Sequence, residues 1–370
     1  AKDSTILYCK NHRTCLLMQI EGKDVLQRLN PKKIIWPMLI GLSVAGWLFY
    51  DNYDSKVFTQ IDWTWHSTFW MILAGFSVFV RDLAYMIRIR VLTDNELTWY
   101  RSFIVIMLWE FSSALAPGII GGGFLFAIFI LNREGINLGK SITTITFTSF
   151  LDGVFLAVMA PLVYLLVGKE ALFSGVNVGQ SSLGTSIFYS FWVVYFIILA
   201  YKLFIAYALF INPYLIKKIL TGICSFPVLK RFRKGAIETG DQLIIASNGL
   251  KDKNLKYWML SLLATFASWT ARYSIVNCLI HAFHGQTALS DLIVYGKQVI
   301  MGIIILLSPT PGGSGIAELM FTDFLGEFIH KGLAPTLGIL WRLISYYPYL
   351  IVGALILPRW IRERIVKKIF

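Results

Sequence analysis

The stretch SPTPGGSGIAELM, residues 308–320, interrupts an otherwise apolar region of the chain. Its prolines remove backbone donors and its glycines favour turns, so a continuous helix cannot pass through it. Glu318 follows the glycines, and the chain then becomes apolar again. We therefore expect a helix that stops inside an apolar environment, and a second helix that begins after Gly315.

The chain as a whole is strongly apolar. Its 370 residues are 56% hydrophobic and 15% aromatic, and the mean hydropathy is +0.64. A soluble domain of this length would need a more charged surface. Crossing a bilayer takes about 20 apolar residues. The sequence therefore predicts an all-α polytopic membrane protein with about six full spans, at residues 34–50, 67–87, 141–167, 187–211, 258–283 and 337–357.

The net charge of +13 is concentrated in three basic segments, residues 2–33, 217–256 and 359–368. Segments 51–66 and 168–185 carry little positive charge. Cytoplasmic loops of membrane proteins are enriched in Lys and Arg, so we expect the basic segments and both termini in the cytoplasm. Basic segments beside spans also attract anionic lipids. This accounts for the charge, and no nucleic-acid partner is expected.

A second interruption, APGIIGGG at residues 116–123, divides the apolar region 102–131, just as the first divides region 292–328. The halves of each region have roughly 15 residues, too few to cross about 30 Å of hydrocarbon at 1.5 Å per residue. We therefore expect two broken helix pairs that dip into the membrane and return, although charge alone also allows both pairs to cross fully. Both interruptions contain the pattern PGxxG, formed by Pro117, Gly118 and Gly121 and by Pro311, Gly312 and Gly315.

Under this topology each half of the chain has two spans, a broken pair and a further span, and the halves have opposite orientation. An inverted repeat whose broken helices meet near the membrane midplane is typical of secondary transporters. The expected organisation is a basic N-terminal segment at 1–33, a transmembrane domain at 34–358 and a basic tail at 359–370. Within the domain, the halves are about 34–167 and 187–358, and the second half contains the basic segment 213–256.

Ionisable side chains inside a membrane are costly and usually face a cavity or a partner. Arginines suit bidentate contact with phosphate, and carboxylates can balance them or bind a proton. Helix ends freed at the breaks could add backbone donors for an anion. The residues that form the breaks are Pro117, Gly118, Gly121, Pro311, Gly312, Gly313 and Gly315. The candidate substrate-binding side chains are Glu318, Arg342, Arg272, Asp152, Lys297 and Glu110.

Structural readings of these charges remain open. Arg81 and Asp82 could pair near the cytoplasmic end of their span, and Glu110 could pair with Arg101 or Arg272. Lys297 could reach the outer interface. The sequence contains no hydrolase, metalloprotease or phosphate-loop motif, and its four cysteines lack metal-type spacing. We therefore expect no catalytic residue, metal or cofactor.

The motif PTPGGSGIAE, with an arginine about two dozen residues later, resembles the signature of the lysylphosphatidylglycerol synthase transmembrane-region family. Pro311, Gly312, Gly313, Gly315, Glu318 and Arg342 match that signature. In the first half, LNREGINLGKSITTITFTSFLDGVFL resembles the family at Arg133 and Asp152. The chain differs at the first break, where the family often has Gly-Glu and this chain has Gly122, Gly123 and Phe124.

The resemblance implies a stand-alone flippase-like domain without the aminoacyl-transferase domain of full-length members. The expected function is translocation of a phospholipid or lipid-linked head group, with anionic or phosphate-bearing lipids as partners. Two alternatives stay open, an integral-membrane transferase acting on a polyprenyl-phosphate-type carrier and a membrane scaffold that transports nothing. We expect the chain in a bacterial cytoplasmic (inner) membrane, and a homo-oligomer stays open.

Overall fold

The computed structural model describes residues 63–116, 123–174, 182–223, 225, 233–283, 288–306, 308–310, 312–329 and 333–366. Several expectations lie outside these ranges: the first span at 34–50, the N-terminal segment, the end of the basic tail, and the break residues Pro117, Gly118, Gly121 and Pro311.

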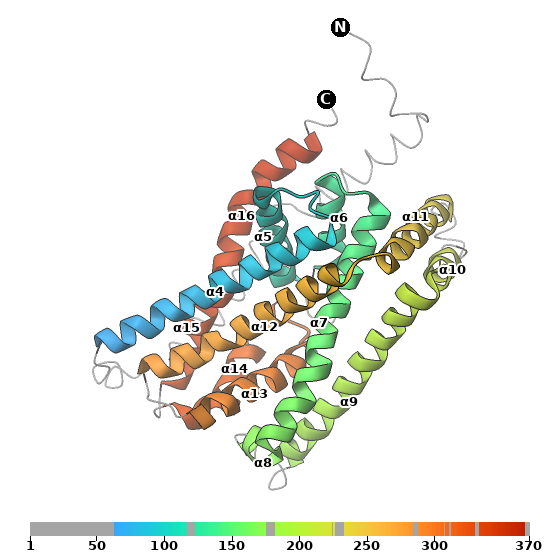
Figure 1. Ribbon diagram of the computed structural model, residues 1–370. Coiled ribbons are helices and arrows are strands. Elements are labelled where there is room, and N and C mark those ends of the chain that lie inside the picture. The colour runs from blue at the N-terminus through green and yellow to red at the C-terminus, as the bar shows by residue number, and fades with distance from the viewer. Residues whose placement is uncertain are drawn as a thin grey trace.

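The described residues form an all-helical protein (Figure 1). The first part contains α4 (Trp65–Leu92), α5 (Trp99–Leu115), α6 (Phe124–Arg133), α7 (Leu138–Val167), α8 (Lys169–Leu172) and α9 (Ser182–Ala206). The helices of the basic segment 213–256 are α10 (Pro213–Ile223) and α11 (Arg233–Lys251). The last part contains α12 (Leu255–Phe283), α13 (Ala288–Ile305), α14 (Ile316–Leu325), α15 (Ala334–Ser345) and α16 (Tyr347–Ile361).

Four apolar stretches of the described chain are long enough to cross a membrane: Trp65–Leu92, Leu138–Val167, Ile187–Ile211 and Ala334–Arg364. They contain the expected spans 67–87, 141–167, 187–211 and 337–357, which confirms the all-α membrane class. The expected span 258–283 lies in α12, a helix of 29 residues that packs along α4 (Figure 1). It is not among the four apolar stretches, so the number of full spans stays a prediction.

Both regions that carry a PGxxG pattern are divided into two helices, as expected. Region 102–131 forms α5 and α6, and region 292–328 forms α13 and α14. The second helix of each pair has only 10 residues, which is about 15 Å and cannot cross a bilayer. Each begins after a glycine with positive φ, +77° at Gly123 and +85° at Gly315. Glycine tolerates that conformation, because it lacks a Cβ atom.

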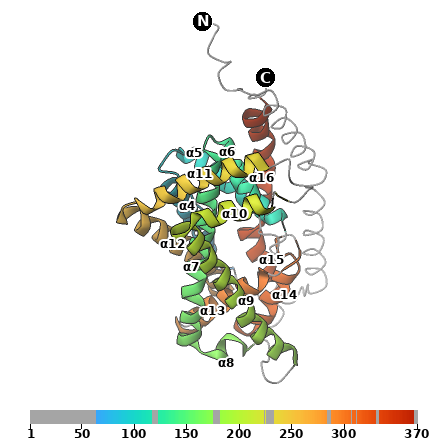
Figure 2. The ribbon, with the colours of Figure 1, turned by 90° about the vertical axis from the view of Figure 1, so that its right-hand side faces the viewer.

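The two broken pairs lie at opposite ends of α7, with α5 and α6 near one end and α13 and α14 near the other (Figures 1 and 2). Two broken pairs that enter the membrane from opposite sides would have this arrangement. The expected pseudo-two-fold symmetry between the halves stays a prediction.

The last apolar stretch departs from the expectation of one span at 337–357, because it is interrupted at Tyr346. There α15 ends and α16 begins, and Tyr346 itself has a φ of −129° and a ψ of −56°. Pro348 explains the interruption, since its ring lacks an N–H and clashes with the preceding turn of a continuous helix.

The helix α16 packs against α5 in the first part of the chain. At its end, the indole of Trp360 donates to Glu134 Oε1 at 2.7 Å, and Arg364 donates to both oxygens of that carboxylate. Glu134 is buried at the end of α6. A hydrophobic cluster of α4, α5 and α6 residues therefore also contains Tyr349 and Trp360 of α16.

Gly353 lets α16 approach α5 closely, and its replacement by alanine should destabilise the protein. A Cβ atom at Gly353 would lie 2.4 Å from Cβ and Cγ of Phe111. Such overpacking costs about 1–3 kcal/mol. The measurement is thermal unfolding in detergent. Gly75→Ala in α4 is the matched control, because its Cβ would meet nothing within 4 Å. An equal melting temperature for Gly353→Ala and Gly75→Ala would contradict the close contact.

Candidate functional site

An ion pair between Glu318 and Arg342 holds the turn at the second helix break. We call the group formed by Gly312, Ser314, Gly315, Glu318 and Arg342 the break clasp. Arg342 Nε donates to Glu318 Oε1 at 2.9 Å. Its Nη2 donates to the Gly312 carbonyl at 2.9 Å and to Ser314 Oγ at 3.1 Å. The N–H of Gly315 donates to Glu318 Oε2 at 2.7 Å. Both charged residues are only 6% exposed.

In the break clasp, the backbone donor and the arginine that were expected to bind an anionic substrate contact groups of the protein. The N–H freed before α14 is bound by Glu318, and the guanidinium of Arg342 is held by three acceptors. The ring of Tyr346 covers the same guanidinium, with 3.8 Å from its centroid to Cζ. The clasp therefore fixes the shape of the turn. Direct head-group binding by Glu318 and Arg342 stays a prediction.

The two helix breaks contact each other. The N–H of Gly312 donates to the carbonyl of Ala116 at 3.4 Å, and the hydroxyl of Tyr346 donates to the carbonyl of Ala114 at 3.0 Å. Ala114 and Ala116 lie where α5 ends, directly before the first break. The two broken pairs are therefore in contact, and the expectation that they meet near the centre of the membrane stays a prediction.

A second group of charges lies near the middle of the long helices α4, α7 and α12. We call it the central charged cluster. Asp152 lies halfway along α7, and Arg272 lies just beyond the middle of α12. The members come from α4, α5, α7 and α12: Arg81, Asp82, Arg88, Glu110, Asp152 and Arg272.

One part of this cluster is centred on Asp152. Arg88 Nη1 donates to Asp152 Oδ1 at 2.6 Å and also reaches Thr265 Oγ1 at 3.2 Å. The indole N–H of Trp269 donates to the same carboxylate oxygen at 2.8 Å. These contacts join α4, α7 and α12 in a region where a buried charge needs partners.

The other part is centred on Arg81, whose side chain is fully buried. Its Nε donates to Asp82 Oδ1 at 3.3 Å, and its Nη2 lies 3.7 Å from Glu110 Oε2. The hydroxyl of Tyr349 donates to Asp82. Neither Nη1 nor Nη2 of Arg81 has a hydrogen-bond partner in the described part of the chain.

Arg272 forms neither an ion pair nor a hydrogen bond with any described residue. Its guanidinium carbon lies 5.3 Å from the ring centroid of Trp269. The charges of Arg81 and Glu110 lie near enough to act on it. Arg272 is thus a partly buried cation whose donors are not used by the described protein.

The structure separates the six side chains suggested by the sequence. Glu110, Asp152 and Arg272 belong to the central charged cluster, whereas Glu318 and Arg342 form the break clasp. Lys297 contacts neither group, because it lies 2.7 Å from Glu327 Oε1 and donates to Ser174 Oγ at 2.9 Å. By their direct contacts the six side chains fall into two groups and a separate pair, and a common substrate site for them stays a prediction.

Two pairing expectations also need correction. Glu110 approaches Arg81, whereas Arg101 lies 3.8 Å from Glu134. Arg81 and Asp82 do form a pair, as one of the open readings had it, and the pair belongs to the central charged cluster. Which end of α4 faces the cytoplasm stays a prediction. Partner choice follows from helix packing, which places α5 against α4.

Two functional candidates were missed by sequence reasoning, Arg88 and Lys202. Lys202 Nζ donates to the carbonyl and the hydroxyl of Ser149, both at 2.7 Å. Its stem lies against Gly153, where a Cβ atom would be 2.4 Å from Lys202 Cγ. The signal was present, since Lys202 is the one charged residue in the apolar run 187–211.

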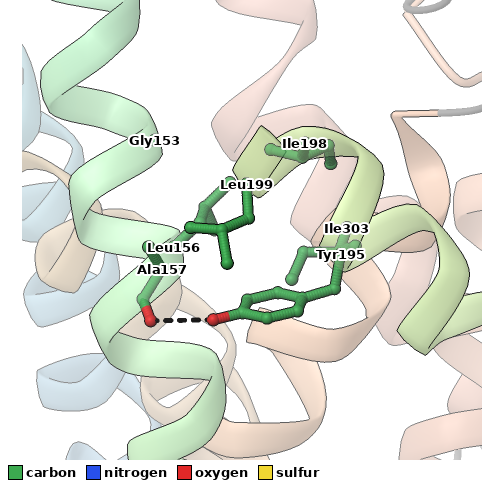
Figure 3. A pocket seen from close by; sticks show the side chains of 7 residues that line it. All are labelled: Gly153, Leu156, Ala157, Tyr195, Ile198, Leu199 and Ile303. Atoms are coloured by element: carbon green, nitrogen blue, oxygen red, sulfur yellow. Dashed lines mark hydrogen bonds between the residues drawn. The ribbon is translucent and has the colours of Figure 1, made fainter. Parts of the chain in front are cut away.

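Close to Asp152, an apolar pocket lies between α7, α9 and α13 (Figure 3). It is lined by Gly153, Leu156, Ala157, Tyr195, Ile198, Leu199 and Ile303. The hydroxyl of Tyr195 donates to the Ala157 carbonyl at 3.0 Å (Figure 3). The volume of about 10 Å³ is near the lower limit for one water. The pocket does not hold a head group.

Among the described residues, no group of His, Cys, Asp and Glu side chains could hold a metal ion.

Residues 34–353 match the family described as lysylphosphatidylglycerol synthase TM region. The chain belongs to this family. It is also similar to the UPF0104 membrane protein of Archaeoglobus fulgidus, with 22% identity over 336 residues, which cover 86% of this chain and 94% of the relative. No solved structure matches the chain. The family resemblance inferred from the break motif is confirmed.

Outside the membrane-spanning helices, Asp94 joins three segments at one end of the bundle. It follows α4 with a φ of 55°, and it accepts hydrogen bonds from Lys140 at 2.8 Å and from Lys253. Burial disfavours the charged carboxyl, but the hydrogen bonds from the two lysines outweigh burial and lower the pKa of Asp94.

The pKa of Asp94 is lower in the folded protein than in the unfolded chain, where it is about 3.9. The charged carboxyl therefore stabilises the fold at pH values above 3.9, and this stabilisation is lost as the pH falls through the lower, folded-state pKa. We therefore expect the melting temperature of the native protein to fall more than that of Asp94→Asn between pH 5 and pH 3. Parallel melting curves for the two proteins over this range would contradict the linkage.

Proposed function

We propose that this protein moves a phospholipid or a lipid-linked head group across the membrane, along a path that passes the central charged cluster. The proposal rests mainly on one observation, the gathering of six charged side chains from four helices near the middle of the bundle. Charges at that depth are costly, and they usually mark a path for a polar substrate. A scaffold that transports nothing has no need of them.

The meeting of the two breaks supports a role for the PGxxG turns in shaping this path. In the proposal, the contact between Gly312 and Ala116 forms a wall of the path, and the break clasp keeps that wall in place. Tyr349 links the clasp region to the cluster, because it lies on α16 next to Tyr346 and donates to Asp82. Non-helical backbone at membrane depth is tolerated where it lines such a cavity.

The proposed cargo is anionic or carries a phosphate, because arginines suit the recognition of phosphate oxygens. We place the protein in a cytoplasmic membrane with both termini inside, on the strength of the three basic segments. The relative in Archaeoglobus fulgidus is archaeal, so family membership does not restrict the proposal to bacteria.

The test is lipid translocation in vesicles that contain the purified protein. Fluorescently labelled phosphatidylglycerol, phosphatidylethanolamine and a short polyprenyl phosphate are incorporated in both leaflets. Reduction of the outer label by dithionite then reports how fast the inner label reaches the surface. We expect the label of at least one lipid to become fully reducible in protein-containing vesicles. The heat-denatured protein is the control for leaks, and rates equal to that control for all lipids would overturn the proposal.

A further inference from the structure

Lys202 is a half-buried cation whose hydrogen-bond partners are both neutral. It lies in the stretch Ile187–Ile211, which is long enough and apolar enough to cross a membrane. Its Nζ atom donates to the carbonyl and to the hydroxyl oxygen of Ser149, both at 2.7 Å, and it forms no ion pair with a described residue. An ammonium group at this depth is costly and usually has a partner of opposite charge. The two bonds to Ser149 leave the charge of Lys202 without such a partner.

The stem of Lys202 lies flat against α7, which is possible because residue 153 is glycine. A Cβ atom at Gly153 would lie 2.4, 2.6 and 2.8 Å from Cγ, Cδ and Cε of Lys202. Carbon atoms that are not bonded prefer about 3.5–4.0 Å, so a larger residue at this position would push the lysine away from α7. Gly153 directly follows Asp152. The lysine stem therefore crosses α7 beside this carboxylate.

Asp152 thus lies between two cations that come from different helices. Arg88 of α4 donates to its Oδ1 at 2.6 Å, whereas Lys202 of α9 is held at Ser149, three positions earlier in α7. Residues with this spacing are neighbours on a helix, with about 5–6 Å between their Cβ atoms. The charge of Asp152 already acts on Lys202. Because the lysine stem is flexible, rotation about its bonds can move the ammonium group from Ser149 toward Asp152.

We propose that Lys202 is a second counter-ion of Asp152, which replaces Arg88 when the contact between α4 and α7 opens. In the structure, Arg88 holds Asp152 and Lys202 is bound to Ser149. When Arg88 withdraws, Lys202 leaves Ser149 and forms an ion pair with Asp152. The carboxylate then has a cationic partner in both states, and the cost of a lone buried charge is avoided.

The packing of the helices shows why the second cation must come from α9. The helix α4 packs extensively along α12 but touches α7 at only a few residues, whereas α9 packs against α7. When α4 moves away from α7, Arg88 moves with it and Lys202 stays beside Asp152. This inference rests on the proposed function in one respect, because it takes the separation of α4 and α7 to be a step of translocation.

A double-mutant cycle on the full-length protein in detergent tests the exchange by melting temperature. The variants are Arg88→Ala and Lys202→Met, alone and combined. Lys202→Met should lower the melting temperature by at least about 3 °C more in the Arg88→Ala background than in the native one, because only there does Lys202 hold Asp152. Lys169→Met, which removes a lysine from the exposed helix α8, is the matched control and should act equally in both backgrounds. Equal effects of Lys202→Met in both would overturn the proposal.

The cycle is repeated with Arg88→Gln, a milder change whose side chain can still donate a hydrogen bond. Two further substitutions then distinguish a lysine that moves from one that attracts Asp152 from a fixed position. Asp152→Asn should abolish the coupling between Arg88 and Lys202. Ser149→Ala should lower the melting temperature of the native protein but not that of the Arg88 variants, in which Lys202 has already left Ser149. Equal effects of Ser149→Ala in all backgrounds, or a coupling that survives Asp152→Asn, would rule out the exchange.

Translocation measurements separate this inference from the transport proposal. Lys202→Met should slow lipid translocation at least about tenfold, because Asp152 is left alone when Arg88 withdraws. Lys202→Arg keeps the charge and should keep most of the rate. Normal translocation by folded Lys202→Met would overturn the exchange, even though the native protein transports lipid. If the coupling through Asp152 is present but the native protein moves no lipid, the second counter-ion stands and the transport proposal falls.

Discussion

Replacing Arg342 by alanine will destabilise the protein by about 3–5 kcal/mol, the usual cost of removing one partner of a buried ion pair. The change leaves Glu318 charged and 6% exposed. It also removes the donors that hold the carbonyl of Gly312 and the hydroxyl of Ser314. The measurement is unfolding by heat or by denaturing detergent, followed through helix content. Arg342→Lys should recover only part of the loss, because one ammonium group cannot reach all three acceptors.

The double variant Glu318→Leu/Arg342→Met tests the role of the turn. Replacing a buried ion pair with apolar residues often restores stability. Here we expect incomplete recovery, because the Gly315 N–H and the Gly312 carbonyl would lose their partners, at about 1–3 kcal/mol each. A stable Arg342→Ala protein that no longer binds lipid would contradict the clasp and assign Arg342 to the head group.

The second large effect is expected at the pair of Arg88 and Asp152. There, a double substitution should restore the stability of the protein without restoring lipid translocation. Arg88→Ala removes the 2.6 Å contact to Asp152 and should cost about 3–5 kcal/mol, as for other broken buried pairs. Arg88→Met/Asp152→Leu should recover most of that loss, because side-chain groups make these contacts and no backbone group depends on them. Translocation should nevertheless stay at least about tenfold below that of the native protein, because the path has lost two of its charges.

Stability and translocation are measured on the same preparations of these variants. The substitution Ser174→Ala, next to Lys297 and away from the cluster, serves as a control for handling. Normal translocation by the stable double variant would remove Arg88 and Asp152 from the path. It would then leave them as a structural pair between α4 and α7.

Local sequence rules predicted the helix breaks well. The PGxxG patterns placed the ends of α5 and α13 and the starts of α6 and α14, because proline and glycine act on the backbone within one turn. The interruption at Tyr346 was missed, although the sequence YYPY contains the proline that causes it. A single proline near the middle of an apolar run is a weaker signal than a proline followed by several glycines.

Pairing of the charges was harder to predict, because a sequence shows which residues are costly but not which helices touch. Arg88 and Asp152 are 64 positions apart and meet only because α4 and α7 cross. Glu318 and Arg342 were both predicted as site residues, but the bonds of Arg342 to Gly312 and Ser314 depend on the exact shape of the turn. Lys202 was missed because the residues around it are apolar, and the run 187–211 was predicted only as a membrane span.

The packing of α16 has a consequence for the chain as a whole. This helix comes last in the sequence, yet Tyr349 and Trp360 complete a core made by α4, α5 and α6, and Glu134 ties its end to α6. The halves are interlaced, since the first half lacks part of its interior until the final helix has been synthesised. Fragments made by cutting the chain between them would each expose unfinished apolar surface. The halves must therefore assemble together, and the packing of α5 and α6 is completed only after α16 has been inserted.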